Sequence, residues 1–349
     1  QKMAYFIPFG STDKDAYDKG VGLSELFPTN VTGIVSGNDG VAIAPTKAEL
    51  TRRMDIVKNA TDEKDIFNLW GRFSRGQTAE KIQNDVLSDG TITPIAFRPF
   101  DSRWTYYSGN SCGWVLWPRE KTTMGHLLAE PTSPIGTNIG LVFCKTSRSF
   151  FSPFVAKNII AHRLFSAMCE ITYIAPLYLR SESGLTAETW TANLNEEAFN
   201  KLTKHMPVKP TPIEVFDYVY GILHDPVYCE KYEQYLCRDF PRVPVINEPE
   251  NERAEDAFFV SEELYKEYVT TGERLRKLHL MQTKQPAEIA LEPNTADDME
   301  IGAVKYKNGV LQINANKCIT GISQSVWEYQ IGGHQVLDKW FKEHKGETL

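Results

Sequence analysis

Cysteine is scarce in this sequence, and its spacing excludes two kinds of small cross-linked site. The 349 residues include six cysteines, and none belongs to a C-x-x-C pair of the kind that binds structural zinc. Their density is also far below that of a small disulfide-bonded scaffold. We therefore expect reduced thiols, a cytoplasmic location and no metal site.

Long apolar runs are missing as well. No stretch has the roughly 20 consecutive apolar residues of a membrane-spanning helix, and no secretory leader is visible. Hydrophobic residues make up 42% of the chain and charged residues 24%, which is ordinary for a folded globular protein. We expect about two or three domains and no membrane partner.

Motifs of several enzyme classes are also absent. There is no G-x-x-x-x-G-K-[ST] phosphate loop, no G-x-S-x-G nucleophile elbow, and no Asn-Pro-Pro-Tyr or Asn-Pro-Pro-Phe tetrapeptide of an adenine-N6 methyltransferase. Glu343-His344-Lys345 matches half of a nuclease E-x-K motif, but Asp338 lies too close, in the same predicted helix, to supply the other half. We therefore expect that the chain is not itself an enzyme.

Charge is distributed unevenly along the chain, whose net charge is −7. Residues 95–168 contain eight Lys/Arg and three Asp/Glu, a local excess of +5, whereas residues 186–300 contain 12 and 23, a local excess of −11. Nucleic acid is bound by local basic surface, so one face of an acidic protein can bind DNA. Chance variation in surface charge explains the same asymmetry equally well.

Apolar periodicity and turn-forming residues predict an α+β fold. Asn38-Asp39-Gly40, between two β-branched runs in Asn30–Ile43, indicates a hairpin, and a helix begins at Pro45–Leu50. A short helix is predicted between Trp117 and Leu128. Strands dominate the middle of the chain, at Thr91–Phe97, Trp104–Tyr107, Gly140–Lys145, Phe151–Ala156 and Thr172–Leu179.

Helices are predicted from about Asn195 onward. Thr211-Pro212-Ile213-Glu214 is a capping box with proline at the first helical position, and His224-Asp225-Pro226 ends that helix. A second helix is predicted over Val227–Cys237, and a third begins at Ser261. The apolar residues of the third that we expect in the core are Leu264, Tyr268, Leu275 and Leu278.

The end of the chain has the clearest local signal. Asn308-Gly309 within Val304–Ile313 predicts a β-hairpin, and a closing helix follows Gly332-Gly333 with Val336, Leu337, Trp340 and Phe341 on one stripe. We thus expect a mixed β-sheet region, then a helical region, then a terminal β-hairpin plus helix. The predicted domains are an N-terminal α/β part (1–90), a basic β-rich core (91–185), a helical subdomain (186–290) and the hairpin with its helix (291–349).

The segment Phe97–Tyr107 combines two arginines, an aspartate and five aromatic residues. Arginines beside aromatics suit a surface that binds phosphates or bases. A structural interpretation is favoured, in which a twisted strand buries one face and Asp101 pairs with Arg98 or Arg103.

Several short segments of the sequence together resemble the C-terminal target recognition region of Type ISP restriction-modification enzymes, and of related single-chain restriction enzymes with an adenine-N6 methyltransferase. The resemblance covers nearly the whole chain, in the order of the family. Ala175, where an aromatic is more common, and His334, where tyrosine is usual, depart from it. The segments that carry the resemblance are Leu26–Ile34, Phe97–Tyr107, Trp117–Glu120, His126–Leu128, Asn138–Leu141, Ala175–Leu179, Phe216–His224, Asp239–Pro244 and Ile331–Trp340.

The resemblance implies a recognition module that needs no cofactor. Its partners would be double-stranded DNA and the methyltransferase, nuclease and ATPase domains of the same polypeptide. Base edges would be read in the major groove, while basic groups hold phosphates and the target adenine flips into the methyltransferase.

The residues that contact DNA are expected in polar, basic loops between the segments that resemble the family. Arg119 and Lys121 could hold phosphate near a helix start. The candidate DNA-binding residues are Arg148, Lys145, Arg163, Lys157, Asn158, Ser147, Arg119 and Lys121, and each could instead belong to a solvated loop.

Two other functions stay open. One is a protein-interaction or structural module of the same enzyme without base readout, which the acidic helical region favours. The other is a carbohydrate-binding or hydrolytic protein, suggested only by seven tryptophans and 15 tyrosines. Affinity for DNA or heparin that falls steeply with salt argues against the first, and sugar binding insensitive to salt supports the second.

Overall fold

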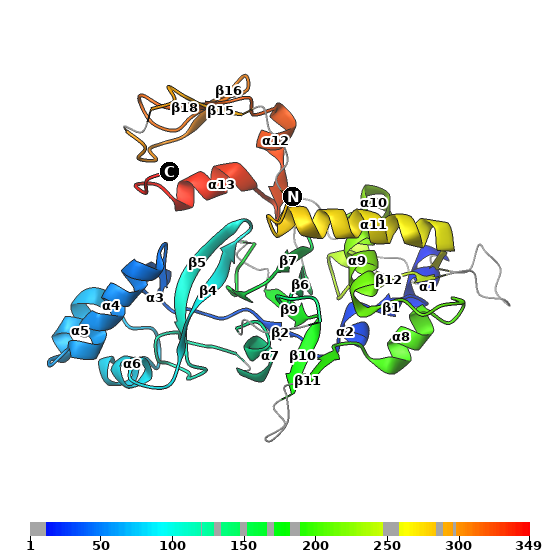
Figure 1. Ribbon diagram of the computed structural model, residues 1–349, viewed down its shortest axis with the longest axis horizontal. Coiled ribbons are helices and arrows are strands. Elements are labelled where there is room, and N and C mark those ends of the chain that lie inside the picture. The colour runs from blue at the N-terminus through cyan, green and yellow to red at the C-terminus, as the bar shows by residue number, and fades with distance from the viewer. Residues whose placement is uncertain are drawn as a thin grey trace.

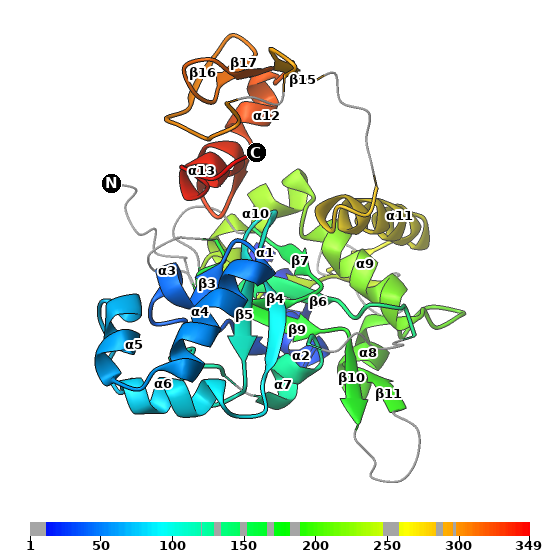
Figure 2. The same ribbon diagram turned by 60° about the vertical axis from the view of Figure 1, so that its left-hand side comes forward.

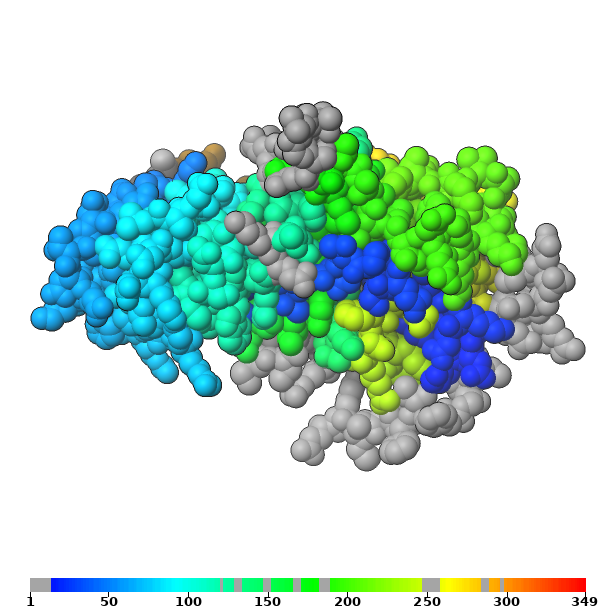
Figure 3. Space-filling view, turned by 90° about the horizontal axis from the view of Figure 1, so that it is seen from below, coloured from blue at the N-terminus to red at the C-terminus, as the bar shows by residue number. Residues whose placement is uncertain are grey.

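The molecule is elongated (Figures 1 and 3): residues 39–86 lie at one end, residues 196–246 lie at the other, and residues 12–26 pack beside the latter. It combines helices with several sheets, so the predicted α+β class is confirmed. The computed structural model describes residues 12–119, 121–128, 134–146, 152–165, 171–181, 189–246, 258–283, 289–295 and 298–349.

Helices α3 to α6 pack beside a four-stranded sheet of order β3-β5-β4-β8. The strands predicted at Thr91–Phe97 and Trp104–Tyr107 are present as β4 and β5, and they pair as a long antiparallel hairpin with an irregularity between Ala96 and Arg98. Thr46 accepts a hydrogen bond from the Glu49 amide and so begins the predicted helix α4. The elements are β3 (Ile43–Ala44), β4 (Thr91–Arg98), β5 (Asp101–Tyr107), β8 (Ile159–Ile160), α3 (Asp39–Ala42), α4 (Lys47–Asn59), α5 (Glu63–Trp70) and α6 (Ala79–Val86).

The hairpin predicted at Asn38-Asp39-Gly40 is wrong. These residues begin the short helix α3 instead, and the Asn38 side chain donates to the Trp70 carbonyl at 2.7 Å. The β-branched runs on either side pair with distant strands, since β2 joins β9 and β3 joins β5. Long-range pairing therefore overrides the local turn signal.

A second sheet, of order β2-β9-β6-β7, is buried on both faces. Alternate residues of β6 point into two different cores, Val142 into the core of the N-terminal half and Leu141 and Phe143 into that of the helical half. The sheet therefore joins the two halves of the molecule. Its strands are β2 (Val31–Thr32), β6 (Gly140–Cys144), β7 (Phe154–Ala156) and β9 (Thr172–Pro176), with α7 (Lys121–Gly125) and the hairpin of β10 (Tyr178–Ser181) and β11 (Thr189–Ala192) nearby.

The helices of the helical region begin and end close to the predicted residues. The capping box at Thr211 and the N-cap at Ser261 are both formed. Leu264, however, is 39% exposed, and Tyr265 faces the core in its place, so the predicted apolar stripe of this helix was wrong at its start. The helices are α8 (Glu196–Leu202), α9 (Pro212–Ile222), α10 (Pro226–Leu236) and α11 (Glu262–His279); beside them lie α1 (Thr12–Asp18), α2 (Leu23–Leu26), β1 (Val21–Gly22) with β12 (Arg242–Val243), and β13 (Val245–Ile246) with β14 (Phe259–Val260).

The C-terminal part, residues 289–295 and 298–349, forms a small sheet of its own above the rest of the molecule (Figure 2). Asn308 and Gly309 both have positive φ, which confirms the Asn-Gly hairpin. Helix α13 lies between this sheet and the main body. The elements are β15 (Ala290–Glu292), β16 (Lys305–Lys307), β17 (Val310–Gln312), β18 (Cys318–Thr320), α12 (Gln324–Glu328), β19 (Gln330–Ile331), β20 (His334–Gln335) and α13 (Val336–Glu343).

The described residues form three hydrophobic clusters, one in each of the two halves joined by the second sheet and one in the C-terminal part. The four-domain division stays a prediction. Among the described residues, every helix is too short or too polar to cross a bilayer.

Candidate nucleic-acid interface

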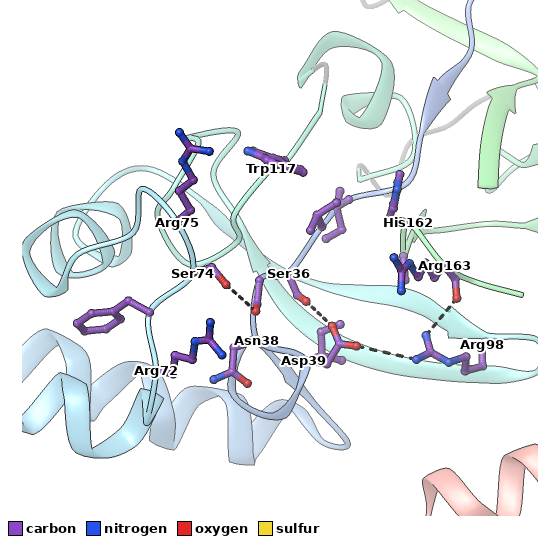
Figure 4. Close-up of a pocket in the computed structure, with 16 residues that line it drawn as sticks. Ser36, Asn38, Asp39, Arg72, Ser74, Arg75, Arg98, Trp117, His162 and Arg163 are labelled. Atoms are coloured by element: carbon purple, nitrogen blue, oxygen red, sulfur yellow. Dashed lines mark hydrogen bonds and ion pairs between the residues drawn. The ribbon is translucent and has the colours of Figure 1, made fainter. Parts of the chain in front are cut away.

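A cavity of about 840 Å³ opens beside the β4–β5 hairpin (Figure 4). We name it the arginine cleft because four arginines line it against a single acid, Asp39. The arginines come from three segments that are distant in the sequence. The lining residues are Ile34–Asp39, Ile43, Arg72–Arg75, Arg98, Trp117 and Ala161–Arg163.

One wall of the cleft is the loop between α5 and α6, which carries Arg72 and Arg75. The Ser74 hydroxyl donates to the Gly37 carbonyl at 2.8 Å, and buried Gln77 accepts from the Ser74 amide at 3.1 Å. Both arginines are exposed, and neither makes an ion pair with any residue that the structure describes. The fold therefore presents two solvated guanidinium groups on a loop that is fixed by its neighbours.

Arg163 and Arg98 occupy the opposite wall but have different surroundings. Arg163 is exposed, whereas the Arg98 side chain is only 13% exposed and lies over the Phe97 ring. Arg98 also donates to the Arg163 carbonyl and faces carboxylates of Asp39 at 3.9 Å and Glu343 at 3.5 Å. Arg98 thus holds the wall together, and Arg163 is the arginine of this wall that solvent reaches.

Arg119 lies at the edge of the cleft. Its guanidinium donates to the Gly33 carbonyl at 3.2 Å and to Nδ1 of His162 at 3.4 Å. Burial lowers the pKa of His162, and the charge of Arg119 lowers it further. Because arginine can only donate, His162 is neutral in this contact and accepts at Nδ1.

The arginine- and aromatic-rich segment Phe97–Tyr107 contacts the end of the C-terminal helix. Arg103 pairs with buried Asp101 at 3.0 Å and donates to the Glu343 carbonyl at 3.1 Å. His344 lies 3.5 Å from Asp101, and Glu347 lies 3.5 Å from Arg103. The structural interpretation of this segment is therefore confirmed, as a buried ion pair that receives the end of α13.

The structure separates the residues predicted to bind DNA. Arg163 lines the arginine cleft and Arg119 adjoins it, while Lys157 and Asn158 line another hollow, of about 150 Å³, near the end of α11. Lys145 lies 3.8 Å from Asp239 and over the Phe240 ring. Ser147 and Arg148 fall outside the described residues, as does the side chain of Lys121. A DNA-contact role for each of these eight residues stays a prediction.

Sequence reasoning missed Arg72, Arg75 and Trp117 as members of this site. A signal was present, since two arginines stand in a loop rich in glycine and serine between Gly71 and Gly76. Within the described ranges, no three His, Cys, Asp or Glu side chains are grouped as they would be around a metal ion.

Solved structures resemble this fold at low sequence identity. The ATP-dependent Type ISP restriction-modification enzyme LlaBIII bound to DNA matches with a TM-score of 0.67 and 18% identity, over 94% of this chain and 22% of that one. A nuclease-deletion mutant of the Type ISP enzyme LlaGI, in complex with a DNA substrate mimic, matches with a TM-score of 0.62 and 17% identity, over 94% and 25%. A DrdV–DNA complex matches with a TM-score of 0.65 and 19% identity, over 99% and 34%. The chain thus spans between about a fifth and a third of the length of these proteins.

No curated protein sequence matches the chain. The family model described as the Type ISP C-terminal specificity domain matches residues 25–349, nearly the whole sequence. The chain therefore belongs to the family of Type ISP C-terminal specificity domains.

Proposed function

We propose that this chain recognises a double-stranded DNA sequence for a Type ISP restriction-modification enzyme. It has no catalytic role of its own and positions the DNA for an adenine-N6 methyltransferase, a nuclease and an ATPase motor in the rest of the parent polypeptide. The observation that carries the proposal is the family match over residues 25–349. A cytoplasmic location goes with this role, because the enzyme meets its DNA there.

The arginine cleft supports the same role. Arg72 and Arg75 on one wall of the cleft and Arg163 on the opposite wall are solvent-exposed cations, and DNA phosphates are the anions that such concave basic surfaces bind. The predicted residues Lys145, Lys157, Asn158 and Arg119 would extend this contact beyond the cleft.

Methylation mapping tests the proposal. The full-length parent gene would be expressed with and without the region of this chain, and methylated adenines located by single-molecule sequencing. We expect one methylated motif that disappears with the deletion. Methylation that persists at the same motif would show that another region reads the sequence and that this chain is an interaction or structural module.

A further inference from the structure

Trp117 is an exposed aromatic ring in a cationic cavity. Its three preceding residues, Trp114, Val115 and Leu116, are buried, whereas Trp117 itself is 49% exposed and lines the arginine cleft. Single exposed apolar residues are common on protein surfaces. This one is distinguished by its place, because Figure 4 shows it on the rim of the cavity with Arg75 on one side and His162 and Arg163 on the other.

The backbone at Trp117 is fixed by its neighbours. The Trp117 amide donates to the Val35 carbonyl at 3.0 Å, and the Val35 amide donates back to the Trp117 carbonyl at 2.9 Å. Proline follows at position 118 and restricts the backbone further. The indole is therefore presented to the cleft without being buried by the fold.

The groups around the ring suit one nucleotide better than a duplex. The Arg119 guanidinium lies 5.5 Å from the centre of the ring and is itself anchored on Gly33 and His162. A cavity of about 840 Å³ is in the range of small-molecule sites. Basic grooves that display an aromatic ring bind nucleic acid by stacking an unpaired base on the ring while the cations hold the backbone.

We propose that the arginine cleft receives one nucleotide that has left the base stack of the bound DNA, with its base on Trp117. Arg72, Arg75 and Arg163 then hold the flanking phosphates, and Ser36 and Ser74 line the space between. The proposal rests on the DNA-recognition role proposed above. This nucleotide is distinct from the adenine that is methylated, because the methyltransferase pocket lies in another part of the enzyme.

Fluorescence of 2-aminopurine tests this directly. The probe would be placed, one position at a time, in duplexes that contain the methylated motif, and bound by full-length enzyme carrying Trp117, W117A, W117L or W117F. At one position other than the methylated adenine, we expect fluorescence several-fold higher with W117A and W117L than with Trp117 or W117F, because only aromatic rings stack on the base. Affinity would fall roughly 5- to 150-fold with loss of the ring.

Two controls make the result decisive. Y329A removes an aromatic ring, 44% exposed, from the C-terminal part and should leave every position unchanged. The probe at the methylated adenine brightens in all variants and reports that the duplex is bound. If no position other than the methylated adenine becomes brighter in W117A and W117L, the inference is overturned. The proposed recognition role is tested separately, by mapping which motif the same enzyme methylates.

Discussion

At the scale of the residue, the shape of the arginine cleft depends on close backbone contacts. Ile34 and Ala161 form a bridge two residues before Arg163, and a Cβ added to Gly33 would lie 2.5 Å from the Ala161 carbonyl group and 2.7 Å from the His162 amide. No side chain fits there without moving one of the two backbones. Gly33 therefore sets how closely one edge of the cleft approaches the other.

We expect Gly33→Ala to destabilise the fold by about 1–3 kcal/mol, because the added methyl group overpacks this crossing. Its thermal midpoint should fall by several degrees. Gly40→Ala is the matched control, since the nearest atom to its added Cβ is Asn38 Oδ1 at 3.5 Å and the site is helical. Equal midpoints for the two variants in differential scanning calorimetry would contradict this account.

At the scale of the element, the sequence predicts helix starts well because their chemistry is local. Thr46, Thr211 and Ser261 each cap the helix that they were expected to begin. The error at Asn38–Gly40 has the opposite cause, because the strands beside it pair with strands at least 60 residues away in the chain. The arginine cleft was missed for the same reason, since three distant segments assemble it.

Helices α9 and α11 cross at an unusually short distance, which predicts a second sensitive position. A Cβ on Gly272 would lie 1.8 Å from the Asp217 carbonyl oxygen, and Arg276, one turn later, pairs with the Asp217 carboxylate at 2.6 Å. We expect Gly272→Ala to separate the helices and cost roughly 2–5 kcal/mol, because it also breaks a buried ion pair. Urea unfolding monitored by circular dichroism measures this. Thr271→Ala, at the exposed neighbouring position, should not lower the urea midpoint.

At the scale of the whole molecule, charged groups dock the C-terminal part on the β4–β5 hairpin. His344 faces Asp101, Glu347 and Arg103 at this contact. Burial lowers the pKa of His344, but hydrogen bonds to Asp101 and to the Trp340 carbonyl outweigh it, so the pKa is raised overall. A raised pKa in the folded state means that protonation of His344 strengthens the contact.

The docking should therefore be pH-dependent. The stabilisation that protonated His344 gives to this contact is fully present below the pKa of an unfolded histidine, about 6.5. It is lost as pH rises through the higher pKa that His344 has in the folded protein. We expect the amides of α13 to exchange hydrogen faster at pH 8 than at pH 6, after correction for intrinsic exchange rates. The variant His344→Gln should remove this difference, and an undiminished pH effect in that variant would assign it to another group.

The exposed arginines Arg72 and Arg75 test the proposed contact between the arginine cleft and DNA phosphates. Each phosphate contact releases counterions, so the logarithm of the binding constant falls with the logarithm of salt concentration in proportion to the number of contacts. Arg72→Ala and Arg75→Ala should each weaken binding of the full-length enzyme to any duplex and reduce that slope by about 1.

Arg52→Ala is the matched control, because this exposed arginine pairs with Glu49 on α4, outside the cleft. Fluorescence anisotropy at several salt concentrations supplies the slopes. If all three variants keep the wild-type slope, Arg72 and Arg75 do not contact phosphate, and the basic surface that meets the DNA lies outside the arginine cleft.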